Sequence, residues 1–278
     1  MNQTADIKRP VFFISDRTGI TAETLGNALL SQFDVGAFNP MTLPFINSIE
    51  KAQSTLEYVS HAGETSGLRP IIFSTTVTDE VREVLKTTDA MFLDLFDTYI
   101  DRIEHELDMK SADVVGRVHG ASNEDSYRTR IDAMNFALQH DDGASDRDYD
   151  KADVIIIAPS RCGKTPTCIY MAMQHGQFAA NYPLTPDDLE RKGLPRMLAE
   201  YQHKLYGLTS DVDQLHRVRS ERRPGSEYAS VQQVGYELRQ AEALYRKFGI
   251  PFVNSNAKSI EELATIIMQE KALHRITF

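Results

Sequence analysis

Short apolar runs alternate with segments of helix length in the first half of the chain. Residues 11–14 form an apolar, β-prone run, and the apolar residues that follow recur at helical spacing. Similar runs occupy residues 70–77 and 91–95, and the mainly polar residues 78–88 separate them. Strands that alternate with helices are typical of a parallel sheet with crossover helices.

The second half repeats this alternation. Further strands are predicted at residues 154–157, 178–182, 204–208 and 251–253. Between the last two, apolar residues from Val231 to Tyr245 recur every three or four positions and predict a long amphipathic helix that ends near Gly249. Ser259 and Glu262 have the spacing of a capping box and predict the start of a final helix. We therefore expect an α/β fold of mostly parallel sheets with flanking helices.

The length of 278 residues allows one large domain or two small ones. Residues 141–150 contain five Asp and no large aliphatic side chain, which is typical of a solvated linker. We therefore expect an N-terminal α/β half at residues 1–150, ending in this Asp-rich linker. A second half at residues 151–278 would then follow it.

Charge and composition narrow the function classes. The formal net charge is −10, with the acidic excess in residues 1–150, whereas residues 151–278 are slightly basic. An acidic chain is poorly suited to bind nucleic acid, and no apolar stretch approaches the ~18 residues of a membrane helix. The two cysteines, Cys162 and Cys168, provide neither a disulfide framework nor a zinc motif. We expect a cytoplasmic protein with no nucleic-acid or membrane partner.

A phosphate-binding loop is the clearest motif. The predicted strand 154–157 runs into a segment that matches GxxxxGK[ST] except at its first position. The candidate nucleotide-binding residues are Ala158, Pro159, Ser160, Arg161, Cys162, Gly163, Lys164 and Thr165. In such a loop the backbone N–H groups and Lys164 contact phosphates, and the Thr165 hydroxyl can bind Mg²⁺. The simpler alternative is an ordinary strand-to-helix turn. We expect the C-terminal half to resemble P-loop kinases.

Acidic residues near this loop are candidates for the chemistry. Asp141 and Asp142 are our choice for a general base and for support of Mg²⁺, although a helix end with a solvated acidic loop would explain them equally well. His140 is more typical of a helix end than of a catalytic site. Asp16 is either at a sheet-edge ligand site or the cap of the next helix. Asp94 is a weak candidate for a magnesium ligand, as is Asp97.

Four arginines lie close together before Pro224. They are Arg217, Arg219, Arg222 and Arg223. A charged run of this kind usually forms a solvated helix face. The alternative is contact with phosphate, which guanidinium groups bind through paired hydrogen bonds.

Several separated motifs together resemble the bacterial phosphoenolpyruvate synthase regulatory protein family. They are the residues at 13–16, 19–23, 140–143, 160–167, 180–183 and 243–247, and the resemblance extends from about residue 10 to the C-terminus. It implies a bifunctional enzyme that uses ADP to phosphorylate a threonine of phosphoenolpyruvate synthase. It also implies that inorganic phosphate removes this group as pyrophosphate. Lys164 and Arg161 would stabilise the transferring phosphoryl group, and the resemblance is compatible with a homodimer.

Other functions remain open at this point. The related regulators of pyruvate,phosphate dikinase perform the same chemistry on another target, although the Arg161-Cys162-Gly163-Lys164 version of the loop favours phosphoenolpyruvate synthase. The loop alone would also suit a kinase of small molecules or a noncatalytic, nucleotide-dependent adaptor. Ala158 stands where members of the family have glycine. We expect it to be tolerated, because later loop positions line the phosphates.

Overall fold

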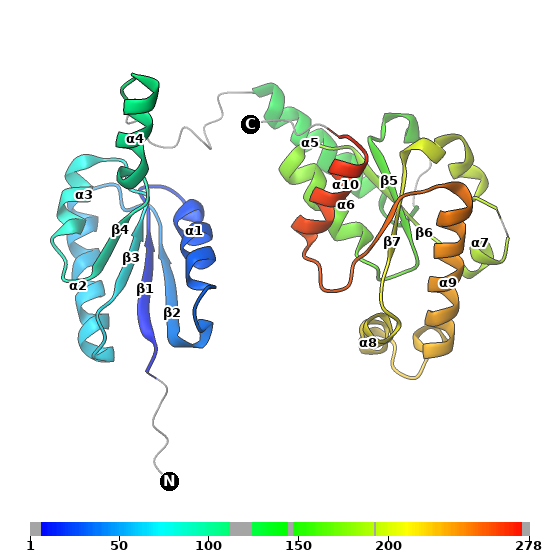
Figure 1. Cartoon of the computed structure of the whole chain (residues 1–278), viewed down its shortest axis with the longest axis horizontal. Helices are drawn as coiled ribbons and strands as arrows, with labels where there is room; N and C mark the ends of the chain where they lie inside the picture. Colours follow the sequence, from blue (N-terminus) through cyan, green and yellow to red (C-terminus); the bar gives the residue numbers. More distant parts are fainter. Residues whose placement is uncertain (1–6, 112–123, 144–146, 192, 274–278) are drawn as a thin grey trace, which may run out of the picture. The chain divides into compact units, whose positions relative to one another are not determined.

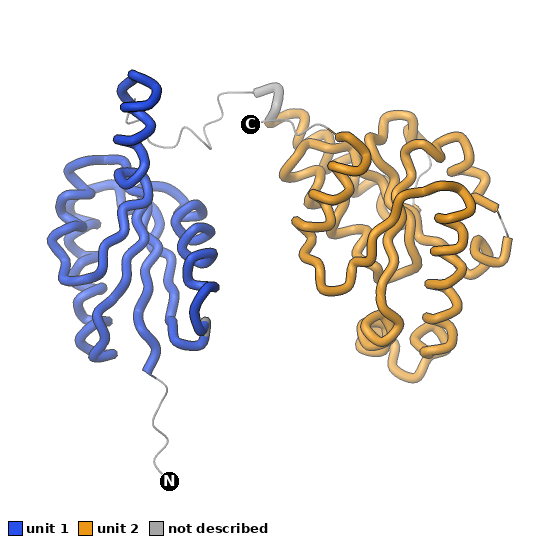
Figure 2. The backbone as a smooth tube through the Cα atoms, in the orientation of Figure 1, with its two compact units in different colours: residues 1–120 blue, residues 121–278 orange. Residues whose placement is uncertain are grey.

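The computed structural model describes residues 7–111, 124–143, 147–191 and 193–273. The chain forms two compact units, residues 1–120 and residues 121–278 (Figure 2). Each unit is built on a four-stranded, all-parallel sheet with flanking helices, which confirms the predicted α/β class. The predicted boundary between residues 150 and 151 lies inside the second unit, because helix α5 (Glu124–Gln139) packs against helix α6 (Lys164–His175).

Unit 1 is a three-layered arrangement of helices around its sheet (Figure 1). Its strands, in the order β2-β1-β3-β4, are β1 (Arg9–Ile14), β2 (Phe38–Leu43), β3 (Ile71–Ser74) and β4 (Met91–Asp94). Its helices are α1 (Ile20–Leu30), α2 (Ile49–Ser66), α3 (Asp79–Lys86) and α4 (Asp97–Leu107). Val11 and Phe13 pack toward α1, whereas Phe12 and Ile14 pack toward α2 and α3, as alternation along a strand requires.

Unit 2 repeats this strand order. Its strands, in the order β6-β5-β7-β8, are β5 (Val154–Ala158), β6 (Ala179–Pro183), β7 (Leu205–Thr209) and β8 (Phe252–Asn254). Its remaining helices are α7 (Pro186–Glu190), α8 (Val212–Arg222), α9 (Val231–Phe248) and α10 (Ile260–Glu270). Strand β5 is buried on both faces: Ile156 packs with residues of α6 and α10, and Ile157 packs with residues of α9. All predicted strands are present, and the capping box of Ser259 and Glu262 is confirmed.

Strand β2 was not predicted from the sequence. It contains Pro40, which pairs with Val11 of β1. Proline lacks a backbone N–H and is therefore usually excluded from strands, except at a sheet edge. Strand β2 is such an edge strand. None of the helices in the described parts of the chain is long and apolar enough to cross a membrane.

The strand order of unit 2 determines where a ligand can bind. The chain runs from β5 to its neighbour β6 on one side, and the next connection crosses from β6 to β7 on the other side of β5. Ligands of open parallel sheets bind at the carboxyl ends of the strands, at such a change of direction. The segment after β5 is the predicted phosphate-binding loop, so the loop occupies this position.

Candidate functional site

The loop between β5 and α6 has two positions with left-handed backbone. Arg161 has a φ of 73° and Gly163 a φ of 91°. Ala158, by contrast, belongs to β5, and its carbonyl accepts a hydrogen bond from the N–H of Leu184 (2.9 Å). The conformational freedom of glycine is therefore used at Gly163 and not at Ala158. This explains why alanine is accommodated at the first motif position.

We expect Ala158→Gly to leave the affinity for ADP unchanged within about twofold. The variant should instead lower the free energy of unfolding by about 0.5–1 kcal/mol, because glycine weakens a strand that requires no positive φ. Isothermal titration calorimetry with ADP and urea unfolding followed by far-UV circular dichroism would measure the two effects. A marked gain in ADP affinity would contradict this view of the loop.

Lys164 brings a buried cation to the loop. It is the first residue of α6, and only 4% of its side chain is exposed. Its Nζ lies 3.7 Å from Oδ1 of Asp142 and 3.5 Å from the carbonyl oxygen of Pro159. Burial lowers the pKa of this ammonium, and the nearby Asp142 carboxylate opposes the shift. No side chain caps the N-terminus of α6, so the positive end of the helix dipole reinforces the charge of Lys164 at the loop.

A set of hydrogen bonds joins the first turn of α6 to β6. The Thr165 hydroxyl donates to Oδ1 of Asp141 (2.6 Å), and the Asn181 amide donates to the same oxygen (2.7 Å). The carbonyl oxygen of the Asn181 side chain accepts from the backbone N–H of Asp142 (2.9 Å). Asn181 is fully buried in β6. It therefore holds the short helical turn Asp141–Gly143 against the loop.

The two predicted carboxylates thus lie beside Lys164 and Thr165, but they differ in environment. Asp141 is half-buried and accepts two hydrogen bonds. The side chain of Asp142 is 65% exposed, and this residue has a left-handed φ of 48°. Asp142 is therefore the carboxylate that a macromolecular substrate can reach from solvent. The Asp-rich segment begins in the site and is not simply the linker that the sequence predicted.

His140 has a structural role. Its Nδ1 lies 2.8 Å from the carbonyl oxygen of Phe136, and its Nε2 lies 2.5 Å from the carbonyl oxygen of Arg147. The imidazole is buried and stacks on the Phe136 ring, with 4.0 Å between the ring centroids. Both nitrogens thus face backbone carbonyls, one in the last turn of α5 and one in the segment that follows it, as expected for a histidine at a helix end.

Arg219 holds the loop through hydrogen bonds to its backbone, a role that the sequence did not predict. Its side chain is fully buried, and Nη2 donates to Oε2 of Glu237 (2.7 Å). Nε and Nη2 also donate to the carbonyl of Ser160, at 3.3 and 3.0 Å. Nη1 donates to the carbonyl of Tyr228 (3.0 Å), whose hydroxyl lies 2.9 Å from the Ser160 hydroxyl. Arg219 is therefore neither on a solvated face nor a phosphate ligand.

One signal in the sequence could have indicated that a buried arginine pairs with Glu237. Glu237 lies within the apolar stripe of α9, next to Leu238 and three residues after the buried Val234. A carboxylate at a buried helix position requires a cationic or hydrogen-bonding partner. Nothing in the spacing identifies which of the four clustered arginines supplies it.

The loop cysteine Cys162 is not a reactive group. It is buried, and burial raises the pKa of its thiol to about 11. Cys168 is also buried and free, so the two cysteines form no disulfide.

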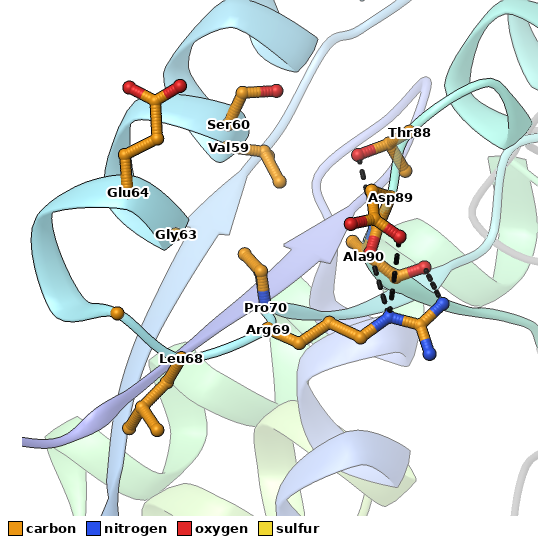
Figure 3. Close-up of a pocket in the computed structure, with 11 residues that line it drawn as sticks. Val59, Ser60, Gly63, Glu64, Leu68, Arg69, Pro70, Thr88, Asp89 and Ala90 are labelled. Atoms are coloured by element: carbon orange, nitrogen blue, oxygen red, sulfur yellow. Dashed lines mark hydrogen bonds and ion pairs between the residues drawn. The ribbon is translucent and has the colours of Figure 1, made fainter.

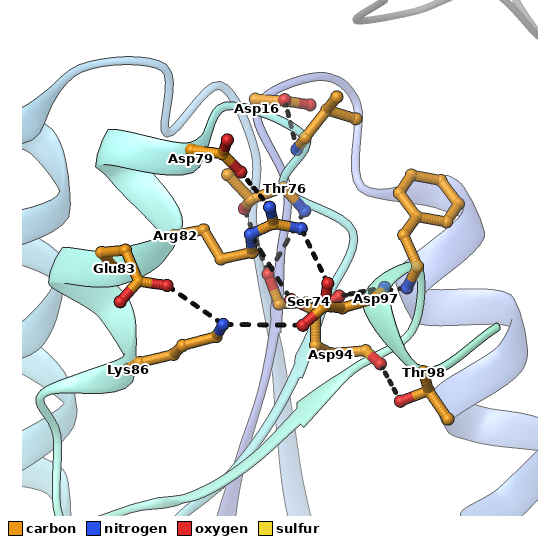
Figure 4. A network of polar contacts seen from close by, with 12 residues as sticks. Asp16, Ser74, Thr76, Asp79, Arg82, Glu83, Lys86, Asp94, Asp97 and Thr98 are labelled. Carbon is orange, nitrogen blue, oxygen red and sulfur yellow. Dashed lines mark hydrogen bonds and ion pairs between the residues drawn. The ribbon is translucent and has the colours of Figure 1, made fainter. Parts of the chain in front are cut away.

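Unit 1 has a polar cluster of its own, at the carboxyl ends of its strands (Figure 4). Asp16 accepts a hydrogen bond from the backbone N–H of Val77 (2.9 Å), and so joins two loops instead of capping α1. Arg82 of α3 forms ion pairs with Asp94 (3.9 Å) and Asp97 (3.6 Å). These contacts hold together the loops of unit 1.

A cavity of 510 Å³ in unit 1 lies at the opposite end of the strands (Figure 3). Pro70 and Ala90, which line it, immediately precede β3 and β4. Arg69 borders the cavity and donates from Nε to the carbonyl of Asp89 (2.8 Å). Because ligands of parallel α/β sheets bind at the carboxyl ends of strands, this cavity is not our candidate site.

Comparison with known proteins identifies the family of this chain. A family model described as kinase/pyrophosphorylase matches residues 11–268. A protein of Alkalilimnicola ehrlichii, named as a proposed phosphoenolpyruvate synthase regulatory protein, is 56% identical over 270 residues, covering 97% of this chain and 98% of that relative. A protein of the same name from Pseudomonas fluorescens (strain Pf0-1) is 50% identical over 269 residues, covering 97% of this chain and 99% of that relative. The chain therefore belongs to the kinase/pyrophosphorylase family.

Proposed function

We propose that this protein regulates phosphoenolpyruvate synthase by ADP-dependent phosphorylation of a threonine, and that it reverses this modification with inorganic phosphate. The family match and the names of the relatives support the reaction class and the target. The observation that carries the proposal is the grouping of the buried Lys164 and of Thr165 with Asp141 and Asp142 at one loop. This grouping combines a phosphate-binding cation with a carboxylate that is open to a protein substrate.

In the kinase direction, the loop N–H groups and Lys164 bind the β-phosphate of ADP. The threonine oxygen attacks the β-phosphorus, the bond from this phosphorus to the bridging oxygen breaks, and AMP leaves. Asp142 accepts the proton of the threonine hydroxyl. Lys164 and the exposed Arg161 offset the charge that the phosphoryl oxygens carry in the transition state.

In the reverse direction, inorganic phosphate occupies the same loop and attacks the phosphorus of phosphothreonine. The bond between this phosphorus and the threonine oxygen breaks, pyrophosphate forms, and the proton that the attacking phosphate gives up reaches the threonine oxygen through Asp142. Both reactions transfer one phosphoryl group between a phosphate oxygen and a threonine oxygen. One set of residues can therefore perform both.

The residues at the loop also fit Mg²⁺. The Thr165 hydroxyl and the Asp141 carboxylate are hard oxygen donors only 2.6 Å apart, and Mg²⁺ is commonly bound by one or two protein oxygens together with substrate phosphates. No group of three or more His, Cys, Asp or Glu side chains in the described residues is arranged to hold a metal by itself. When bound, Mg²⁺ would neutralise phosphate charge, and Thr165 and Asp141 would hold it.

The assigned roles predict different effects for the two carboxylates. Asp142→Asn should lower the rate of threonine phosphorylation by roughly 10²- to 10⁴-fold, the usual contribution of a general base, with little change in ADP affinity. Asp141→Asn should mainly weaken the binding of Mg²⁺-ADP. Single-turnover kinetics and calorimetry separate these effects, with the exposed Asp150→Asn as a control from the same segment. Equal loss of ADP affinity in both site variants would contradict this division of roles.

The decisive test of the function uses ADP labelled at the β-phosphate, phosphoenolpyruvate synthase and phosphoenolpyruvate. We expect label on a threonine of the synthase and loss of synthase activity, followed by recovery and release of pyrophosphate when phosphate is added. Label on pyruvate,phosphate dikinase, with none on the synthase, would show that the dikinase is the target. Transfer from ATP to a metabolite would instead indicate a small-molecule kinase. Regulation that persists in a Lys164→Ala variant would indicate an adaptor. We place the activity in the cytoplasm.

A further inference from the structure

A second cavity in unit 2 opens beside the phosphate-binding loop. It has a volume of 260 Å³, and residues 161–163 of the loop form one of its walls. The opposite walls come from the start of α8, the segment after β8 and the start of α10, through residues such as Gln214, Asn256 and Ile260. Lys164 and Asp141 are not among the lining residues. The cavity is thus continuous with the loop and shares Arg161 with the groups assigned to phosphoryl transfer, whereas Lys164 and Asp141 lie outside it.

The wall that follows β8 is held in place by hydrogen bonds. The Asn254 amide donates to Oδ1 of Asp211 (2.7 Å), and the Asn256 amide donates to the other oxygen of the same carboxylate. Ser255 donates to the carbonyl of Thr209 from both its backbone N–H (2.9 Å) and its hydroxyl (3.0 Å). These contacts join the end of β8 to the end of β7. This wall of the cavity is therefore held in place by contacts within the protein.

The lining suits a flat heterocycle. Leu215 and Leu263 are buried and give the cavity an apolar floor, whereas Ser210, Gln214 and Asn256 provide polar groups. The volume is below the range of about 300–1,000 Å³ that is usual for whole drug-sized ligands, so the cavity has room for one ring system. Ligand pockets usually combine apolar lining with a few polar groups that fix the orientation of the ligand.

The charges at the cavity are also compatible with a nucleotide. Arg161 and Lys258 line it, and no carboxylate is found among its lining residues. A ligand with an apolar ring and an attached anionic group would therefore place the ring in the cavity and the anion toward the loop. Inorganic phosphate and pyrophosphate have no ring and would make no use of the cavity.

We propose that this cavity binds the base of the nucleoside diphosphate whose terminal phosphate lies at the loop. The proposal rests on the proposed function. It adds a difference between the two directions of the reaction: the kinase direction requires the cavity, whereas the phosphate-dependent direction does not. The cavity is then the part of the site that distinguishes ADP from inorganic phosphate.

The test introduces a tryptophan at the cavity. Ile260 lines it and is 37% exposed, so Ile260→Trp places an indole in the space that we assign to the base. The natural sequence contains no tryptophan, so the new side chain also reports ligand binding by fluorescence. The matched control is Thr265→Trp, at an exposed position of the same helix outside the cavity. Gln214→Ala is a second cavity variant that adds no bulk.

We expect Ile260→Trp to weaken ADP binding by roughly tenfold or more and to leave pyrophosphate binding within about twofold of wild type. The rate of phosphate-dependent dephosphorylation should also be retained. Gln214→Ala should lower the ratio of ADP to pyrophosphate affinity in the same direction, and Thr265→Trp should not change it. Calorimetry with the magnesium complexes of ADP and pyrophosphate measures these affinities.

An unchanged affinity ratio in both cavity variants would overturn the proposal. It would also fall if the wild-type protein bound pyrophosphate but not ADP, a result that leaves the phosphate-binding loop intact. If the wild-type protein bound neither compound, the proposed function itself would fail, so the two failures can be told apart.

Discussion

Replacing Lys164 with methionine is expected to abolish phosphoryl transfer in both directions and to make the unliganded protein more stable. Removal of a charge-stabilising group from a phosphoryl-transfer site lowers the rate by roughly 10³-fold or more. The ammonium is buried, its nearest carboxylate oxygen is 3.7 Å away, and burial lowers its pKa. Methionine has a similar length and carries no charge that requires solvation, so Tm should rise by a few degrees.

The direction of the pH effect follows from this pKa. The pKa of Lys164 in the folded protein lies below the ordinary value of 10.5, so the unfolded chain binds this proton more tightly. Burial of the charged ammonium destabilises the folded protein. This destabilisation is lost as the pH rises through the interval up to 10.5, because the folded protein releases the proton before the unfolded chain does. The difference in Tm between Lys164→Met and wild type should be largest near neutral pH and should shrink under alkaline conditions.

Differential scanning calorimetry at neutral and alkaline pH would measure this difference, and the labelled-ADP assay would measure the activity. Lys151→Met is the matched control, because Lys151 is an exposed lysine of the same unit. Transfer at near wild-type rates by Lys164→Met would refute the assignment of the site. A lower Tm would show that the contacts of the Lys164 ammonium contribute more to stability than its burial costs.

Removal of Arg219 is expected to have the largest effect on stability. Arg219→Leu leaves Glu237, whose side chain is 5% exposed, without its cationic partner. Breaking a buried ion pair in this way typically costs 3–5 kcal/mol. The midpoint of urea unfolding, followed by far-UV circular dichroism, should therefore fall by about 1 M or more. An unchanged midpoint would mean that Glu237 is readily protonated or solvated in the variant.

A double variant separates stability from positioning of the loop. Arg219→Leu with Glu237→Leu removes both charges, and such replacements are often neutral or stabilising. The carbonyl of Ser160 nevertheless loses the two N–H donors that hold it. We therefore expect unfolding near the wild-type midpoint but an ADP affinity reduced by roughly tenfold or more. Wild-type affinity in the double variant would show that Arg219 contributes to stability alone.

The local parts of the site could be predicted from the sequence. An apolar run that ends in a loop with Gly163 and Lys164 predicts a strand, a phosphate-binding turn and a helix start, because each step depends on neighbouring residues. The structure has the strand, the turn and the helix start in this order, whereas phosphate binding by the turn stays a prediction. Asp141 and Asp142 were chosen as candidates on their type and position, and the structure places both beside the loop.

The remaining parts depend on long-range contacts that no local pattern encodes. Five Asp in ten residues indicated a solvated linker, but Asp141 is held by Thr165 of α6 and Asn181 of β6, both distant in sequence. A run of arginines indicated a charged surface, but Arg219 turns inward because Glu237 lies on the neighbouring helix α9. In both cases the local pattern favoured a solvated segment, although a polar group within the segment has its partner on another element.

The burial of Cys162 has a consequence for the environments in which this protein can work. The thiolate, not the thiol, reacts with peroxides and alkylating reagents, and a thiol whose pKa is about 11 is almost entirely protonated at neutral pH. A cysteine in the middle of a phosphate-binding loop would otherwise expose the site to oxidative inactivation. Here the sulfur belongs to the apolar core between β5 and α6. We therefore expect oxidation of Cys162 to be slow, so that this cysteine does not make the loop sensitive to oxidants.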